Sequence, residues 1–81
     1  MTVPITPALI GATIKTTRKA LGVTQRNLAL TSGTGLRFII DLEAGKPSCQ
    51  LGKTLTVLRT LGIKIHLSLP NEAVTTTGFG R

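Results

Sequence analysis

The chain has 81 residues, of which 41% are apolar and 2% aromatic, and its formal net charge is +7. A chain of this length forms one small domain with a small aliphatic core. Burial of further apolar surface against a second copy would stabilise such a domain. A single Cys and a single His exclude an internal disulfide and a Cys/His metal cluster, and the excess of positive charge favours a polyanionic partner such as nucleic acid over a role in solubility alone.

The first half of the chain shows the apolar spacing of amphipathic helices. The first helix is predicted to begin at Thr6-Pro7, where a hydroxyl that can cap a helix precedes a proline suited to the first helical position, and to end at Gly22. The second is predicted to begin at Thr24 and to end at a tight break around Gly33, a residue that supplies the positive φ of such a turn.

Two further helices are predicted before the spacing changes. The third is indicated by Leu36, Ile39 and Leu42, and it ends before Gly45. The fourth ends at Gly62 and is indicated by the spacing of Leu51, Leu55, Val57, Leu58 and Leu61.

A period of two replaces the helical period after Gly62. The apolar residues Ile63, Ile65, Leu67 and Leu69 alternate with polar ones, which predicts a half-buried strand over residues 63–69 that Pro70 ends. We therefore predict a domain over residues 1–69 and a flexible tail over residues 70–81, which is poor in apolar side chains.

A lone strand needs a partner for its backbone groups. The favoured partner is the same strand of a second copy, paired about a two-fold axis, so that Ile63, Ile65, Leu67 and Leu69 form the dimer contact. The alternative is pairing with the N-terminal residues, where Val3 and Ile5 alternate.

Residues 24–45 carry the motif that points to function. They resemble the helix-turn-helix of the Xre/Cro/C1 family at the matching positions Thr24, Gln25, Leu28, Ala29, Gly33, Ile39, Leu42, Glu43 and Gly45. The resemblance implies a mainly α, lambda-repressor-like domain of four helices, to which this chain adds one C-terminal β-strand that pairs across a homodimer. It also implies that the third helix lies in the major groove of DNA.

The residues predicted to bind DNA lie on and around that third helix. Arg37 is the leading candidate for reading a base, because its planar fork fits a guanine edge; the alternative is an i,i+4 ion pair with Asp41 on a solvated helix. Asp41 either accepts from a cytosine amino group or orients Arg37. Phe38 either contacts a thymine methyl or packs into the domain. The full predicted set is Gln25, Arg26, Thr34, Gly35, Leu36, Arg37, Phe38, Asp41, Lys46 and Ser48.

Several members of this set are candidates for phosphate contacts. Thr34 and Gly35 start the recognition helix, where free backbone N–H groups favour a phosphate. Gln25 matches a family position that holds a backbone phosphate, and Arg26 and Lys46 are further candidates whose alternative is plain surface charge. The family also pairs an Arg of the first helix with the Glu that ends the third, so Arg18 and Glu43 are expected to form a structural ion pair.

A narrower resemblance covers about residues 9–69. The stretch from Leu36 to Pro47, and the run from Val57 into the strand, look like the HipB-type antitoxins of type II toxin–antitoxin systems. The resemblance implies a dimeric repressor that binds an inverted-repeat operator in its own promoter and also binds a HipA-like serine/threonine kinase toxin. In such proteins the C-terminal tail often helps to bind the toxin, and here it carries Phe79 where some relatives have Trp.

Other functions are alternatives to the antitoxin hypothesis. A stand-alone Xre-family repressor is the first alternative, and a protein-interaction module that does not bind DNA is the second. An enzyme is not expected, because no base, nucleophile or metal constellation is present, and no cofactor or metal is predicted. A chain with no signal peptide and no apolar run of about 20 residues is expected to be cytoplasmic, associated with the nucleoid and away from membranes.

Overall fold

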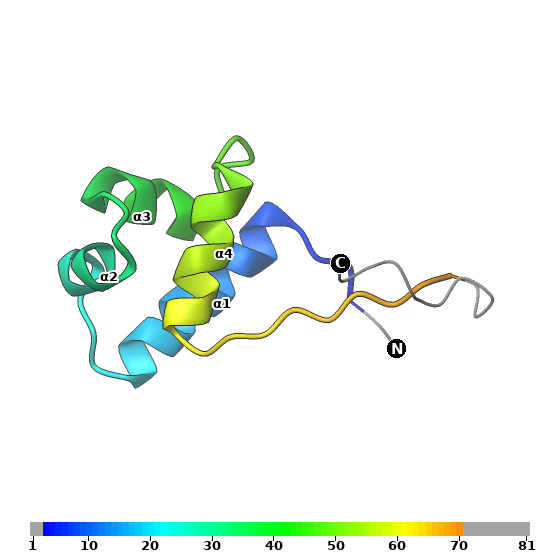
Figure 1. Cartoon of the computed structure of the whole chain (residues 1–81), viewed down its shortest axis with the longest axis horizontal. Coiled ribbons are helices and arrows are strands. Elements are labelled where there is room, and N and C mark those ends of the chain that lie inside the picture. Colours follow the sequence, from blue (N-terminus) through cyan, green and yellow to red (C-terminus); the bar gives the residue numbers. More distant parts are fainter. Residues whose placement is uncertain (1–2, 71–81) are drawn as a thin grey trace.

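The computed structural model describes residues 3–70 and holds four helices within them, which confirms the four helices expected from the apolar spacing. They are α1 (Pro7–Ala20), α2 (Gln25–Ser32), α3 (Leu36–Glu43) and α4 (Leu51–Thr60) (Figure 1). Helix α3 packs against α1 and α2, and α2 also packs against α4.

The ends of the first two helices follow from local chemistry. Thr6 Oγ1 accepts the backbone N–H of Leu9 at 3.0 Å, and Thr24 Oγ1 accepts that of Asn27 at 3.0 Å, so each threonine satisfies a donor that its helix leaves free. Gly33 ends α2 with φ at 72°, in the left-handed region that glycine adopts without a steric cost. The short turn that follows sets the angle between α2 and α3.

The core is aliphatic and receives residues from every helix. Its buried apolar members are Ile14, Leu28, Ala29, Ile39, Leu42, Val57 and Leu58. Four of them, Ile14, Leu28, Ile39 and Val57, are at most 1% exposed. This small cluster holds all four helices together.

The leucine spacing of α4 identifies the helix but not the face that it buries. Leu51 and Leu55 are 70% and 41% exposed, whereas Val57, Leu58 and the polar Thr54 are buried. Thr54 can lie inside because its hydroxyl donates to the carbonyl of Gln50 at 2.8 Å, which leaves no unsatisfied donor.

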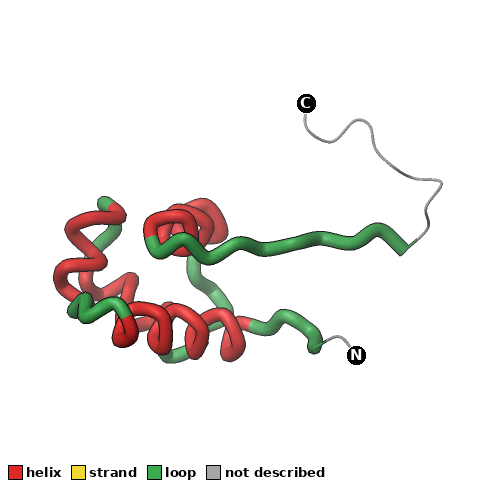
Figure 2. The backbone as a smooth tube through the Cα atoms, turned by 90° about the horizontal axis from the view of Figure 1, so that it is seen from below, coloured by secondary structure: helices red, strands yellow, loops and turns green. Residues whose placement is uncertain are grey.

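The strand predicted over residues 63–69 is not formed within the described part of the chain. In residues 3–70, the only backbone hydrogen bond of this segment runs from the Ile63 N–H to the Leu58 carbonyl at 2.9 Å. After α4 the chain therefore continues as an extended loop (Figure 2). The alternative pairing with Val3 and Ile5 is absent for the same reason. A strand exists only through its partner, so pairing with a second copy stays a prediction. The tail predicted over residues 70–81 lies, after Pro70, outside the described residues.

Helix α1 crosses the end of α3 at a glycine that the sequence analysis did not single out. A Cβ added to Gly11 would lie 2.8 Å from the carbonyl oxygen of Glu43 and closer still to that of Leu42. These are backbone atoms, so a side chain cannot fit without moving one helix away from the other. The close approach of α1 to α3 therefore requires glycine at this position.

This crossing gives a prediction about two helical glycines. Replacing a helical glycine by alanine stabilises an unhindered helix by about 0.5–1 kcal/mol, and Gly52 in α4 has nothing within 4 Å of an added Cβ. We expect Gly52→Ala to raise the free energy of unfolding and Gly11→Ala to lower it by about 1–3 kcal/mol, because the added methyl overpacks the crossing. Urea denaturation of both variants measures the difference. Equal effects of the two substitutions would contradict the close approach of α1 and α3.

Candidate nucleic-acid interface

Helix α3 begins with an N-terminus that no side chain caps. Its N-cap residue is Gly35, and the first intrahelical bond runs from the Ile39 N–H to the Gly35 carbonyl at 3.2 Å, which leaves the N–H groups of residues 36–38 without a helical acceptor. Thr34 differs from expectation, because its N–H donates to the Ala29 carbonyl at 3.1 Å and its hydroxyl pairs with Ser32 Oγ at 3.0 Å. The Thr34 N–H is therefore not among the donors open to an anion at this helix end.

The exposed face of α3 carries both signs of charge. The side chain of Arg37 is 81% exposed, and its Nη2 lies 3.2 Å from Asp41 Oδ1. Lys46, in the loop after α3, places its Nζ 3.5 Å from Asp41 Oδ2. The i,i+4 ion pair that stood as the alternative for Arg37 is thus present in this structure, and it leaves most of the guanidinium exposed.

Leu36 and Phe38 belong to the inner side of the recognition helix. Both are half-buried and pack against the core. Of the two places considered for Phe38, this structure shows packing into the domain. Lys53 of α4 places its Nζ 5.7 Å from the centroid of the Phe38 ring. Lys53 could not be predicted from the sequence, because the approach of α4 to α3 leaves no signal in the local pattern.

The start of α2 lies beside the end of α3. Gln25 donates from its Nε2 to Glu43 Oε1 at 3.1 Å, so its amide is part of the protein's own network as well as a candidate phosphate ligand. The amide has a second N–H that this bond does not use. Arg26 and Ser48 are exposed to solvent.

Arg18 and Glu43, which the sequence analysis pairs, are joined by two hydrogen bonds between α1 and the last residue of α3. Arg18 Nε lies 2.6 Å from Glu43 Oε2 and Nη2 lies 3.0 Å from Oε1. A third bond, from Nη1 to the carbonyl of Val23 at 2.9 Å, includes the turn before α2. The two side chains are only 9% and 3% exposed, so their charges depend on each other.

The surroundings of this ion pair change the pKa of both groups. The hydrogen bond to Glu43 raises the pKa of Arg18. Burial raises the pKa of Glu43, but the hydrogen bonds from Arg18 and Gln25 and the positive charge of Arg18 lower it by more, so that it lies below its ordinary value of 4.5. Both groups are therefore charged at neutral pH.

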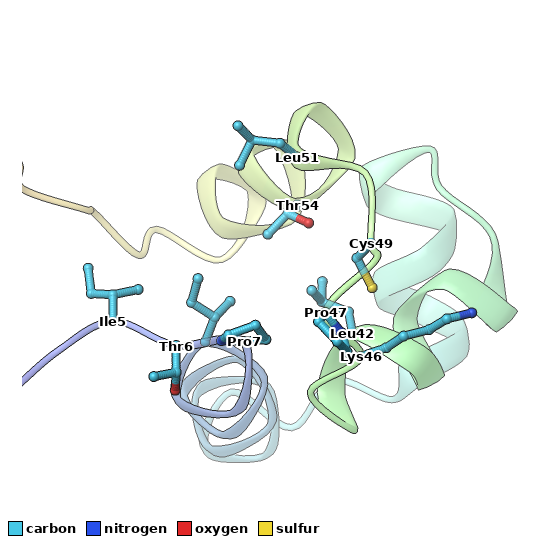
Figure 3. A pocket seen from close by; sticks show the side chains of 10 residues that line it. Ile5, Thr6, Pro7, Leu42, Lys46, Pro47, Cys49, Leu51 and Thr54 are labelled. Atoms are coloured by element: carbon cyan, nitrogen blue, oxygen red, sulfur yellow. The ribbon is translucent and has the colours of Figure 1, made fainter.

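The remaining residues with reactive side chains do not form a site. Cys49 lies on the wall of an apolar cavity of about 180 Å³ between the start of α1 and the start of α4 (Figure 3). His66 is exposed in the segment after α4. In residues 3–70, no three His, Cys, Asp or Glu side chains gather as a metal ion would require. No helix in the same range is long and apolar enough to cross a membrane.

Two packed helices joined by a tight turn, the second with an exposed arginine and an uncapped N-terminus, define a helix-turn-helix DNA-binding protein. An uncharacterized HTH-type transcriptional regulator, y4mF of Sinorhizobium fredii, is 54% identical to this chain over 67 residues, which cover 83% of this chain and 88% of the relative. This chain therefore belongs to the helix-turn-helix transcriptional regulators, a class of DNA-binding proteins. No protein-family model matches the chain.

Solved structures place it more narrowly within that fold. A HipB–O4 20mer complex and a HipA–HipB–O2–O3 complex each match with a TM-score of 0.74 at 21% identity, covering 88% of this chain and 100% of the matched chain. A structure called MDT protein matches with a TM-score of 0.73 at 22% identity over the same shares. The chain thus shares the fold of HipB.

The ion pair predicts how stability depends on pH. Because the pKa of Glu43 is lowered in the folded protein, its contribution to stability is fully present above its ordinary value of 4.5 and is lost as the pH falls through the folded value. We expect Glu43→Gln to lower the free energy of unfolding at pH 7 by about 3–5 kcal/mol, since it leaves Arg18 without its partner charge. The variant should also lose less stability than the wild type between pH 6 and pH 3.

Asp41→Asn is the matched control for this experiment, because it neutralises a carboxylate whose two ion pairs face solvent. Exposed pairs contribute about 0–1 kcal/mol. Urea denaturation across the pH range measures both variants, and equal losses at pH 7 would mean that the Arg18–Glu43 pair adds nothing beyond a surface contact.

Proposed function

We propose that this regulator is a repressor that reads an inverted-repeat operator with α3 from each of two copies and represses its own operon. We further propose that it is the antitoxin of a HipA-like serine/threonine kinase. The observation that carries the DNA-reading part is the exposure of Arg37, 81% of its side chain, at the open end of the second helix of a helix-turn-helix.

Arg37 has the chemistry for reading a base. A guanidinium has five donors, and the contact with Asp41 through Nη2 leaves the others for a guanine, whose N7 and O6 accept two bonds in the major groove. The ion pair in the free protein is compatible with this role because it restricts the motion of the side chain without covering it.

The residues around α3 supply the phosphate contacts of the proposal. The free N–H groups of residues 36–38 lie at the N-terminus of α3. A helix N-terminus binds phosphate through such N–H donors and through the positive end of the helix dipole. Gln25 retains one amide N–H for the same purpose. Arg26, Lys46 and Ser48 are exposed polar groups on the neighbouring segments. Such contacts fix the position of α3 on the duplex and make binding depend on salt.

The segment after α4 supports a dimer. Ile65, Leu67 and Leu69 are 36%, 89% and 43% exposed, so the extended loop presents an apolar row and unpaired backbone groups to water. Pairing of this segment with its copy about a two-fold axis buries the apolar row and satisfies the backbone. A two-fold axis also presents two α3 helices to DNA, which is why the operator is expected to be an inverted repeat.

The toxin partnership rests on likeness of fold. A HipA–HipB–O2–O3 complex is among the solved structures that share this fold over 88% of the chain. A regulator built like HipB is a candidate to bind a kinase built like HipA, and the tail beyond Pro70 offers additional chain for that contact. A stand-alone repressor would bind the same kind of operator but no such kinase.

We expect Arg37→Ala to weaken binding to the preferred duplex by about 1–3 kcal/mol and to relax the preference at one base pair of each half-site. The preferred duplex is obtained by selecting bound sequences from a random pool with the wild-type protein. Lys19→Ala, which removes the same charge from the end of α1, is the control and should leave the base preference unchanged. An unaltered selected sequence with Arg37→Ala would remove Arg37 from the base-reading role.

We expect Leu67→Asp to split the dimer, because a charge replaces an apolar side chain at the centre of the proposed strand pair. The substitution leaves the monomer core untouched, since Leu67 is 89% exposed. Leu30→Asp on α2, where the leucine is 75% exposed, makes the same change elsewhere and should remain dimeric. Sedimentation equilibrium measures both, and a dimeric Leu67→Asp would contradict pairing through this segment.

The toxin partnership is tested by purifying the tagged protein from its native host and identifying what is bound to it by mass spectrometry. A HipA-like kinase in equal amount is the expected result. Recovery of operator DNA with no protein partner would make the chain a stand-alone repressor. If a partner protein is recovered but the binding of this protein to DNA does not weaken as the salt concentration rises, the protein is an interaction module and not a repressor.

A further inference from the structure

Asp41 joins two cations of the proposed DNA-binding face. Its Oδ1 lies 3.2 Å from Arg37 Nη2, and its Oδ2 lies 3.5 Å from Lys46 Nζ. The Lys46 N–H also donates to the Asp41 carbonyl at 3.0 Å, so the loop after α3 is attached to this residue through both backbone and side chain. Each carboxylate oxygen thus holds a different cation.

Negative charge is scarce in this protein, which makes the position of Asp41 informative. Residues 3–70 contain two acidic side chains, Asp41 and Glu43. Glu43 is 3% exposed and is committed to Arg18. Asp41 is 20% exposed and is therefore the carboxylate that a molecule approaching α3 meets.

Stability alone does not account for an acid at this place. Ion pairs with partners as exposed as Arg37 and Lys46, 81% and 54%, contribute little to folding. On a face that approaches phosphates, by contrast, a carboxylate repels the partner within a Debye length of about 8 Å. The presence of a carboxylate at this place therefore needs an explanation other than stability or general attraction to DNA.

We propose that Asp41 is a positioning residue that determines specificity: it lowers affinity for DNA of any sequence and raises the preference for the operator by holding Arg37 and Lys46 in place. The inference rests on the proposed reading of DNA by α3. In this proposal the carboxylate of Asp41 weakens the attraction to phosphates and improves the recognition of bases.

The two effects have separate physical origins. On DNA of random sequence, phosphates compete with Asp41 for Arg37 and Lys46, and the carboxylate repels the same phosphates. On the operator, Arg37 keeps its contact with Asp41 and uses its free donors on a guanine, so that less side-chain entropy is lost on binding. The carboxylate therefore costs affinity wherever Arg37 has no guanine to read.

The test compares the wild type with Asp41→Asn and Asp41→Glu, using full-length protein and two duplexes, the selected operator and one of scrambled sequence. Asp41→Asn keeps the size of the side chain and removes the charge. We expect it to bind the scrambled duplex about 3–10-fold more tightly and to lower the ratio of the two affinities about 10-fold. Asp41→Glu keeps the charge but moves the carboxylate, so affinity for the scrambled duplex should stay low while the ratio still falls.

A double-mutant cycle and a charge control complete the design. Lys46→Ala should weaken binding to the scrambled duplex more in the Asp41→Asn background than in the wild type, because Lys46 is then free to reach a phosphate. Glu72, the third acidic residue of the chain, lies outside the described residues. Glu72→Gln changes the net charge as Asp41→Asn does and should leave the ratio of the operator and scrambled-duplex affinities unchanged.

The outcomes separate this inference from the proposed function. If the wild type prefers the operator and Asp41→Asn keeps that preference, or if Glu72→Gln changes it equally, the role of Asp41 is overturned while DNA reading by α3 stands. If the wild type selects no sequence above random, the proposed function fails and the role of Asp41 fails with it. Melting curves of each variant identify any change that comes from loss of folded protein.

Discussion

The buried ion pair between Arg18 and Glu43 determines how the first three helices meet. A charge that is almost fully removed from water must meet its counter-charge, and these two come from α1 and from the last residue of α3. Arg18 also binds the carbonyl of Val23, and Gln25 also binds Glu43, so the same cluster includes the turn before α2 and the first residue of that helix. The direction of α3, and with it the position of Arg37, follows from this cluster.

Close packing supports the same geometry at the same crossing of α1 and α3. Gly11 lets α1 approach the backbone at the end of α3, next to the glutamate that Arg18 holds. A side chain at Gly11 would separate the helices and lengthen the ion pair, so the glycine and the charges act on one crossing. The charges fix which residues meet, and the glycine permits the distance at which they meet.

The two carboxylates of residues 3–70 divide the tasks of the chain between folding and binding. Glu43 is inside, and its pKa is lowered by its donors, so that it serves the fold. Asp41 is two residues earlier on the same helix and faces the cations that would meet DNA. The apolar residues divide in a similar way: a small core holds the helices together, while Leu51, Leu55 and the row after α4 remain exposed. Such an arrangement is typical of a subunit that covers part of its surface with a partner.

The four helices, the hydroxyl caps of α1 and α2 and the helix-turn-helix could be predicted from the sequence, because hydroxyl caps, glycine breaks and apolar spacing act over a few residues. A family resemblance predicted the pairing of Arg18 with Glu43. The buried face of α4, the crossing at Gly11, the contact of Lys53 with Phe38 and the two cations held by Asp41 follow only from the way the helices pack. These features join residues that are distant in the chain or lie in a loop of particular shape, and local spacing has no information about such contacts. The strand predicted over residues 63–69 could not be settled from local sequence either. Its alternation of apolar and polar residues is local, but its hydrogen bonds need a second strand.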